Sequence, residues 1–500
     1  MLNAIKKLWD EKPLRLVLVI ALFLRLIAAV FSKGYGWQDD HYLVIEAAQS
    51  WVDGTDYNKW LPAEGVTTPS GHSFFYPGVH FVLFFLLKQT GITDPQIKMY
   101  IVRFVHALFS MLIVFLGYKI SERLSNKKTA AYTSLLLAVY WFMPFLSVRN
   151  LVEFVCIPFL MLGVWTIMKA EENKKPMLQF LLAGIWFGLA LNTRYQSALF
   201  IGGVGLALLI QKKFIPAFVI GASVACMFAL IQLPVDYALW NRPFAEFGEY
   251  VKYNIESAGD YLSQPWYFYL VMAAGLLIPP VSIFLMLGSF YQWRKQLLIF
   301  LPVIIFFVFH SYFENKQERF ILTVVPFIII LGSTGINNYF VAHERWQKLY
   351  RHPFPRIFFW SLNLILLIPV TFTYSKRAKV ESMSYLSHHE HKNSFIIEDS
   401  NHNSDYVMMS HFYNRDWNSY YQINESTDRK KFIEGFSKEK IPEFVVFIEE
   451  KNLEKRVSDL KQIIPALKQE AVIEPSFMDK LLHWLNPRNA NQTIYIYRTK

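Results

Sequence analysis

Three acidic side chains lie close together in the segment GYGWQDDHYLVIEAAQSW, residues 34–51, directly after an apolar run. A carboxylate beside hydrocarbon is costly unless it is solvated, paired or used. Asp39 and Glu46 are seven residues apart, so on an α-helix they would share a face, whereas Asp40 would point about 100° away. An interfacial carboxylate can act as a general base on a hydroxyl group. Asp39 could instead be a helix N-cap, an alternative that the acidic pair alone leaves open.

Isolated basic and amide side chains occur in other short polar segments between apolar runs. Asn150 and Glu153 lie in SVRNLVE, Arg194 lies in NTRYQ, and Lys316 and Arg319 lie in FENKQERF. Arginine and lysine can hold a phosphate whose lipid tail stays in the bilayer, and a phosphate leaving group needs little protonation. One base and a set of cations would therefore suffice to transfer a sugar from a polyprenyl phosphate, with no cofactor and no metal ion.

Each of these residues also has a simpler interpretation. The asparagine and glutamate of SVRNLVE could form a helix cap, the arginine of NTRYQ could extend to lipid headgroups, and the cations of FENKQERF could pair with neighbouring glutamates. Arg25 and Arg103 are stronger signals because they lie inside predicted membrane spans, where an arginine is costly and usually functional or paired. The simpler interpretations together require several coincidences on one side of the membrane.

The composition indicates a polytopic membrane protein. The chain has 500 residues, of which 53% are hydrophobic, 17% aromatic and only 18% charged. Its net charge of +11 can be explained by the basic cytoplasmic loops of a membrane protein, so it is not evidence for nucleic-acid binding. Apolar runs predict eleven spans. They are residues 14–31, 97–117, 129–146, 151–169, 177–192, 195–210, 214–233, 266–289, 297–313, 320–340 and 356–374.

The basic residues predict the orientation of these spans. They concentrate in segments 6–15, 119–128, 174–175, 212–213, 294–295 and 345–351, which lie on one side if residues 78–88 form a juxtamembrane or re-entrant helix. The positive-inside rule then places the N-terminus inside and the long loop 32–96 outside. We therefore expect a transmembrane catalytic domain over residues 1–374.

Residues 375–500 change character and contain no further predicted span. Short runs at 406–410, 443–449 and 493–498 read as strands, and patterns near 452–470 and 476–485 read as helices. This alternation predicts a small α/β domain on the outer side of the membrane.

The order of these motifs resembles the GT-C fold mannosyltransferases of glycosyltransferase family 22, which build GPI anchors and N-glycan precursors from dolichyl-phosphate mannose. The family carries H-P-D-E followed by Y-Q-x-x-E, to which WQDDHYLVIE is similar. The resemblance places Asp39 on the family aspartate, Asp40 on its glutamate and Glu46 on the later glutamate.

Further family motifs follow in the same order along residues 14–340. HSFFYP resembles R-S-Y-x-Y-P, with His72 in place of the arginine and Tyr76 on its second tyrosine. Asn150 and Glu153 resemble N-x-x-E, and TRYQ at Arg194 resembles R-P-T. VDYALW…YVKYN is similar to the acidic stretch that ends in y-N, QPWYFY around Trp266 to h-P-W-x-x-Y, and NKQERF to H-K-E-x-R-F.

The resemblance implies an inverting transferase with Asp39 as general base and Asp40 as a neighbour that binds the acceptor or caps the helix. It implies substrate contacts from Glu46, His72, Tyr76, Arg103, Asn150, Glu153, Arg194, Trp266, Lys316 and Arg319. The expected partners are a polyprenyl-phosphate sugar, a glycolipid or lipid-linked glycan acceptor and membrane lipids, but no nucleic acid.

The departures from the family motifs leave the sugar and the acceptor open. The short loops and the absence of a targeting signal suggest a bacterial relative, which would use undecaprenyl phosphate at the periplasmic face of the inner membrane. A eukaryotic source would place the active site in the ER lumen. Other classes that fit are a transporter or flippase for a lipid-linked saccharide, a non-catalytic scaffold, and a GT-C transferase for another sugar or a protein acceptor.

Overall fold

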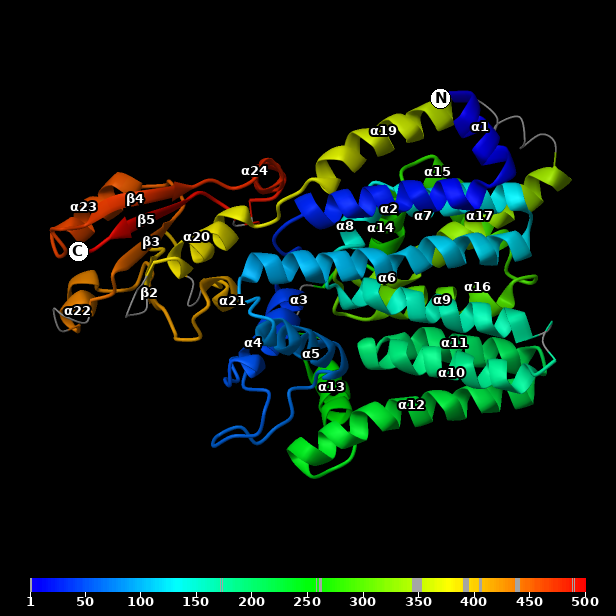
Figure 1. The fold of residues 1–500 in the computed structure, drawn as a ribbon, viewed down its shortest axis with the longest axis horizontal. Helices are drawn as coiled ribbons and strands as arrows, with labels where there is room; N and C mark the ends of the chain where they lie inside the picture. Colours follow the sequence, from blue (N-terminus) through cyan, green and yellow to red (C-terminus); the bar gives the residue numbers. More distant parts are fainter. Residues whose placement is uncertain are drawn as a thin grey trace. The chain divides into compact units, whose positions relative to one another are not determined.

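The computed structural model describes residues 2–500 except 171, 173, 258, 260–262, 344–352, 390–394, 404–406, 437–440, 488 and 490 (Figure 1). The chain forms two compact units. Unit 1 comprises residues 1–30, 59–80 and 100–372, and unit 2 comprises residues 31–58, 81–99 and 373–500. Unit 2 therefore combines the C-terminal residues with the segment that carries Asp39 and Asp40.

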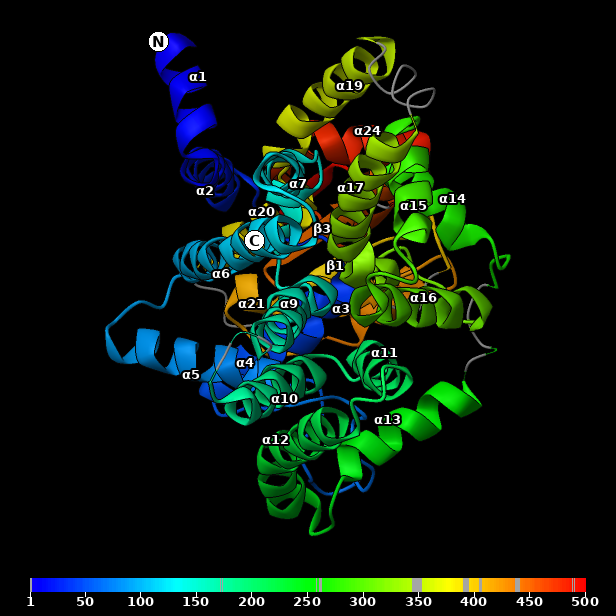
Figure 2. The ribbon, with the colours of Figure 1, turned by 90° about the vertical axis from the view of Figure 1, so that its right-hand side faces the viewer.

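Unit 1 is built from helices. They are α1 (Leu2–Glu11), α2 (Pro13–Phe31), α5 (Phe75–Gln89), α6 (Pro95–Leu124), α7 (Lys127–Val139), α8 (Met143–Leu146), α9 (Val152–Ala170), α10 (Pro176–Thr193), α11 (Ser197–Ile210), α12 (Phe214–Trp240), α13 (Ala245–Glu256), α14 (Phe268–Leu276), α15 (Val281–Tyr291), α16 (Leu297–Tyr312), η3 (Phe320–Val324), α17 (Val325–Ala342) and α19 (Pro353–Thr371). The C-terminal part of α5 and the N-terminal part of α6, within residues 81–99, belong to unit 2. Helix α10 packs between α9 and α12, and Figure 2 shows these three helices nearly end-on.

Seven helices in the described part of the chain are long and apolar enough to cross a membrane. They are α2, α6, α9, α10, α12, the continuous helix Phe320–Tyr339, and α19. The predicted span 266–289 is a pair, α14 and α15, bent by 117°, and the predicted spans 195–210 and 297–313 are the shorter helices α11 and α16. The polytopic class is confirmed, while the count of eleven stays a prediction. The basic segment 345–351 lies outside the described residues.

The predicted span 129–146 is broken at residues 140–142, between α7 and α8. Carbonyl groups freed inside a membrane must find donors, and Arg25 supplies them: its Nη1 donates to Ala138 O at 3.4 Å and its Nη2 to Leu137 O at 3.3 Å. Asn363 donates from Nδ2 to Val139 O at 2.8 Å. The intramembrane Arg25 is thus paired with backbone at a helix end, where a cation also complements the helix dipole.

Three glycines bring α15 and α17 into close contact. A Cβ atom on Gly335 would lie 1.9 Å from the carbonyl oxygen of Gly288, and one on Gly332 would lie 2.4 Å from that of Leu285. Small residues at such positions let membrane helices approach backbone to backbone. Any side chain larger than hydrogen at Gly335 would therefore separate the two helices.

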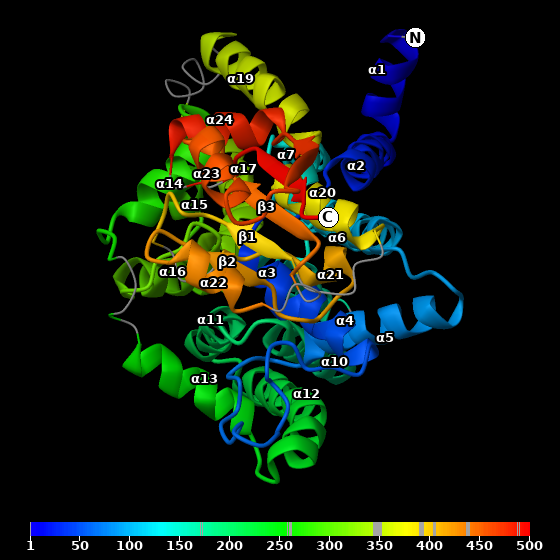
Figure 3. The ribbon, with the colours of Figure 1, turned by 90° about the vertical axis from the view of Figure 1, so that its left-hand side faces the viewer.

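Unit 2 contains a five-stranded mixed sheet in the order β2-β1-β3-β5-β4. The strands are β1 (Ile396–Glu398), β2 (Tyr421–Ile423), β3 (Phe444–Ile448), β4 (Lys468–Ile473) and β5 (Ile494–Arg498). Strand β1 is parallel to β2 and β3, and β5 is antiparallel to β3 and β4. All five residues of β3 are buried, as expected for a central strand covered on both faces (Figure 3).

The helices of unit 2 are mostly short. They are α3 (Gln38–Asp40), η1 (His41–Glu46), α4 (Ala47–Val52), α20 (Arg377–Ser387), α21 (His411–Asn414), α22 (Arg429–Glu434), α23 (Leu453–Lys461) and α24 (Phe477–Leu485). The strands predicted at 443–449 and 493–498 and the helix at 476–485 are present. The strand predicted at 406–410 is wrong, because Val407–Ser410 is irregular and Tyr406 lies outside the described residues. The helix predicted near 452–470 ends at Lys461, and β4 occupies its final part.

Candidate functional site

The acidic segment in unit 2 does not form a regular α-helix. Its residues lie in α3, the π-helix η1 and α4 in succession. The i→i+5 hydrogen bonds of a π-helix change the number of residues per turn, so a spacing of seven no longer defines one face. Asp39 is exposed and Asp40 is 7% exposed. The N-cap of α3 is Trp37, so the alternative that Asp39 caps the helix is wrong.

Glu46 is fully buried and holds a distant part of unit 2. Its Oε1 accepts hydrogen bonds from Ser410 Oγ at 2.6 Å and from the backbone N–H of Phe412 at 3.3 Å. His41 Nε2 lies 2.9 Å from the same Ser410 Oγ. The expectation that Glu46 shares an α-helical face with Asp39 is therefore wrong, and its observed contacts are with α21 and the residue before it.

Lys376 contributes a cation to the surroundings of Asp39. Its ammonium lies 4.8 Å from the centre of the Tyr35 ring, and Tyr35 also stacks on His41 with ring centroids 4.3 Å apart. The pKa of Lys376 is lowered to about 7, chiefly by burial and then by the neighbouring charge of Lys379, with Asp479 and Asp39 acting in the opposite direction.

In unit 1, Glu153, Arg194 and Arg319 form one buried charge cluster. Arg194 Nη2 lies 3.4 Å and Arg319 Nε 3.6 Å from Glu153 Oε1, and the three residues are at most 7% exposed. Arg194 Nη1 also donates to Thr323 Oγ1 at 2.6 Å, and Arg319 Nε donates to Gln317 Oε1 at 2.9 Å. The three side chains bring two guanidinium groups and one carboxylate together in a buried position.

The sequence gives no direct indication of this pairing. The local alternative pairs Arg319 with Glu318, yet its carboxylate partner is Glu153 on another helix. Glu153 Oε2 is buried and has no hydrogen-bond partner among the described residues. The cluster therefore combines two buried guanidinium groups with a carboxylate oxygen that an additional polar group could satisfy.

The remaining predicted cations lie in other surroundings. Lys316 is half-buried, and its Nζ donates to Phe313 O at 2.6 Å. Arg103 is buried in α6, where its Nε donates to Ala29 O of α2 at 2.8 Å and its guanidinium lies over the Tyr100 ring at 4.7 Å. Asn150 is 6% exposed just before α9, whereas Trp266 is 59% exposed.

The loop that carries His72 is held by a carboxylate that the sequence did not single out. Glu246 is fully buried, and its Oε2 accepts from Ser70 Oγ at 2.8 Å, from Gly71 N at 2.7 Å and from His72 N at 3.3 Å. Gly71 has φ +73 and lies against the backbone of Tyr250, so a side chain there would be strained and crowded. Glu246 binds the backbone of His72, whereas the imidazole ring of His72 packs on Trp60 with ring centroids 4.7 Å apart.

Tyr76 follows this loop at the start of α5. Its hydroxyl is hydrogen bonded to His106 Nε2, and His106 Nδ1 lies 2.6 Å from Val102 O. Tyr76 is 5% exposed. Sequence reasoning missed Glu246, His106 and Lys376, because nothing in the spacing of these residues links them to the loop, to Tyr76 or to Asp39.

Comparison with known proteins places the chain among membrane transferases. The sequence profile of the Alg9-like mannosyltransferase family matches residues 16–422. Similar proteins are a GPI mannosyltransferase 3 of Debaryomyces hansenii, 22% identical over 79% of this chain and 71% of the relative, and mannosyltransferase APTG1 of Arabidopsis thaliana, 24% identical over 76% and 71%. The resemblance to glycosyltransferase family 22 is confirmed, and a bacterial source stays a prediction.

Two solved structures share the fold. ArnT from Cupriavidus metallidurans, bound to undecaprenyl phosphate, superposes with a TM-score of 0.62 at 11% identity and covers 97% of each chain. The oligosaccharyltransferase AglB from Archaeoglobus fulgidus, in complex with an inhibitory peptide and a dolichol-phosphate, gives a TM-score of 0.52 at 11% identity over 94% of this chain and 75% of its own. The GT-C fold expected from the sequence is thereby confirmed.

Proposed function

Because this chain belongs to the Alg9-like mannosyltransferase family, we propose that it transfers mannose from a polyprenyl-phosphate donor to a hydroxyl group of a glycolipid or lipid-linked glycan. The family makes it a membrane-embedded glycosyltransferase with a lipid-linked sugar donor. It does not favour a transporter of lipid-linked saccharides. The GPI mannosyltransferases among its relatives support an acceptor of the glycolipid type.

The observation that carries the donor assignment is the cluster of Glu153, Arg194 and Arg319. It brings two guanidinium groups together in a buried position, and guanidinium groups bind anions that can accept hydrogen bonds. A lipid phosphate supplies such an anion, and its hydrocarbon tail suits a helix bundle that spans the membrane. Arg194 and Arg319 are the proposed phosphate contacts, with Glu153 keeping the two guanidinium groups together.

Asp39 is the proposed general base. The acceptor oxygen attacks the sugar carbon as its proton passes to the carboxylate, and the bond from that carbon to the phosphate oxygen breaks, so the lipid phosphate leaves with the electron pair. A single displacement of this kind inverts the configuration at the sugar carbon. The exposure of Asp39 supports this role, because an exposed carboxylate is accessible to an incoming hydroxyl group.

A transfer assay with purified protein tests this proposal. The protein is incubated with radiolabelled polyprenyl-phosphate mannose, or with the glucose and aminoarabinose analogues, and with a lipid extract from cell envelopes. We expect a labelled glycolipid from the mannose donor, with inverted anomeric configuration. Glu64→Gln, an exposed carboxylate in the same loop region, is the matched control for Asp39→Asn and should keep full activity. Transfer from another donor, or retention of configuration, would contradict the proposal.

We further propose that the loop 32–96 and residues 375–500 lie on the non-cytoplasmic side, on the basis of the basic segments. Single cysteines at Lys128 and Ser426, both exposed, are placed in a background with Cys226→Ala, because Cys226 is itself an exposed thiol. An impermeant thiol reagent added to intact cells should label position 426 only. Labelling of position 128 would reverse the proposed orientation.

A further inference from the structure

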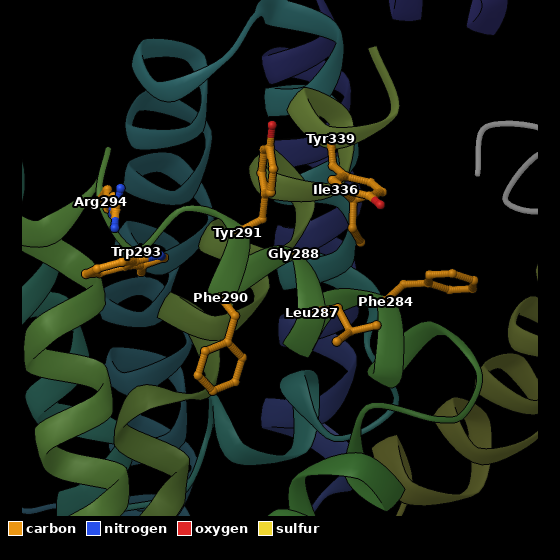
Figure 4. Close-up of a pocket in the computed structure, with 9 residues that line it drawn as sticks. All are labelled: Phe284, Leu287, Gly288, Phe290, Tyr291, Trp293, Arg294, Ile336 and Tyr339. Atoms are coloured by element: carbon orange, nitrogen blue, oxygen red, sulfur yellow. The ribbon is translucent and has the colours of Figure 1, made fainter. Parts of the chain in front are cut away.

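A cavity of about 490 Å³ lies between α15 and α17 (Figure 4). Its lining includes Leu287, Phe290, Trp293 and Arg294 from α15 and the turn that follows, and Ile336 and Tyr339 from α17. The helix that begins at Phe320, next to Arg319, reaches Ile336 after 16 further residues. At 1.5 Å per residue this is about 24 Å. The cavity therefore lies far from the charge cluster of Glu153, Arg194 and Arg319, at the opposite end of this helix.

Most side chains around the cavity are apolar or aromatic, and several are exposed on the surface of unit 1. Leu287 is 59%, Phe290 54% and Trp293 47% exposed, values that are unfavourable in water but normal on a surface covered by lipid. Tyr291 and Tyr339 meet edge to face with centroids 5.0 Å apart. Tryptophan and tyrosine at the end of a membrane helix are typical of the level of the lipid headgroups.

Close packing of the two helices fixes the floor of the cavity. Gly288 lines it, and the backbones meet where a Cβ on Gly288 would lie 2.4 Å from Gly332 O. The glycines hold the helices together, and large aromatic side chains on either side form the walls of the cavity. The cavity therefore follows from the glycine contact together with the aromatic residues beside it.

Among the described residues that line the cavity, Arg294 is the one that carries a charge. Its guanidinium lies over the Trp293 ring at 4.6 Å, and no carboxylate in the described part of the chain lies within ion-pair distance of it. Lys295 follows it and is also exposed, so this end of the helix pair is locally basic. An apolar cavity with the guanidinium group of Arg294 in its lining is complementary to an amphiphilic molecule with an anionic headgroup.

We propose that this cavity binds an anionic phospholipid of the surrounding bilayer, with an acyl chain against the aromatic walls and the phosphate on Arg294. A sugar would leave its hydroxyl groups unpaired against Leu287, Phe290 and Ile336. A free phosphate would use Arg294 but leave the apolar chamber unoccupied. An anionic phospholipid would fill the apolar space with an acyl chain and also place its phosphate on Arg294.

Lipid binding to the full-length protein in zwitterionic nanodiscs tests this site without an activity assay. Phosphatidylglycerol is titrated, and bound lipid is counted by native mass spectrometry after release into detergent. We expect Arg294→Gln to weaken phosphatidylglycerol binding about tenfold or more, because it removes a charge-assisted hydrogen bond. Leu287→Trp, which fills the cavity from an exposed position, should abolish the tightly bound lipid.

Lys295→Gln is the matched control, since it removes the same charge one residue away and does not line the cavity. It should leave the affinity within about twofold, as screened surface charges contribute little. Equal losses in Arg294→Gln and Lys295→Gln would overturn the site in favour of general surface attraction. Unchanged binding in Leu287→Trp, or full competition by inorganic phosphate, would overturn the role of the cavity.

Discussion

Replacing Glu153 by glutamine would test the charge cluster most directly. The substitution keeps the shape of the side chain but removes a carboxylate that lies near both Arg194 and Arg319. The net charge of the cluster then rises by one, in a site where all three side chains are at most 7% exposed. Removing one partner of a buried ion pair typically costs about 3–5 kcal/mol, because the remaining charge is left without compensation. We expect a loss of stability in this range for Glu153→Gln.

The same variant should bind a lipid phosphate more tightly. If the phosphate binds at these guanidinium groups, it meets less competition from a carboxylate and more positive charge. An affinity gain of about tenfold corresponds to about 1.4 kcal/mol, a modest fraction of the lost pairing energy. Arg319→Gln should have the opposite effect on affinity, and the double variant with Glu153→Gln should recover part of the lost stability.

Thermal unfolding followed by tryptophan fluorescence can measure both effects on purified protein in detergent. The unfolding temperature is recorded with and without polyprenyl phosphate, whose binding to the folded state raises it by mass action. Glu318→Gln, an exposed glutamate beside Arg319, is the matched control and should change neither quantity. The reasoning is refuted if Glu153→Gln unfolds at the wild-type temperature, or if the lipid phosphate stabilises wild type, Glu153→Gln and Arg319→Gln equally.

Three further predictions concern unit 2. Asp39→Asn should lower turnover roughly 10²–10⁴-fold, the usual contribution of a general base, and leave the affinity for the donor intact. Asp40→Asn should lower turnover less. Near-normal transfer by Asp39→Asn in radiolabel assays would show that the general base is another residue. Glu46→Gln should weaken two charge-assisted hydrogen bonds and cost about 1–3 kcal/mol, seen as faster proteolysis of unit 2, and unchanged proteolysis would argue against the anchoring role. The pKa of Lys376 falls from 10.5 to about 7 on folding, so between these pH values the unfolded chain binds more protons than the folded chain. The free energy of unfolding should therefore rise with pH across this window, and Lys376→Met should flatten the rise in unfolding curves. An unchanged slope would contradict the burial of the Lys376 ammonium.

The membrane class and most of the membrane helices could be predicted because hydropathy acts locally. A run of about 20 apolar residues must enter the bilayer whatever its neighbours are, so segments such as 214–233 and 356–374 are legible in the chain itself. The break at residues 140–142 was not legible. It exists because Arg25 and Asn363, distant in sequence, satisfy the carbonyl groups that the break exposes.

The candidate site was predicted in its residue types but not in its contacts. The sequence singled out Glu153, Arg194 and Arg319 because charged residues at the ends of apolar runs are costly, and the structure brings these three together. It could not pair them, because residues 153, 194 and 319 lie on separate elements and meet only through helix packing.

The prediction that Asp39 and Glu46 share a helical face failed because the backbone forms the π-helix η1 there and departs from the α-helical period. The sequence by itself determined the membrane-embedded architecture and the family, because these depend on composition and on short motifs. The tertiary structure alone decided that the π-helix η1 buries Glu46 against Ser410, that Glu246 holds the loop before His72, and that Lys376 acts on Asp39. These interactions join residues more than 170 positions apart, and only packing of the folded chain can bring such groups within a few ångströms.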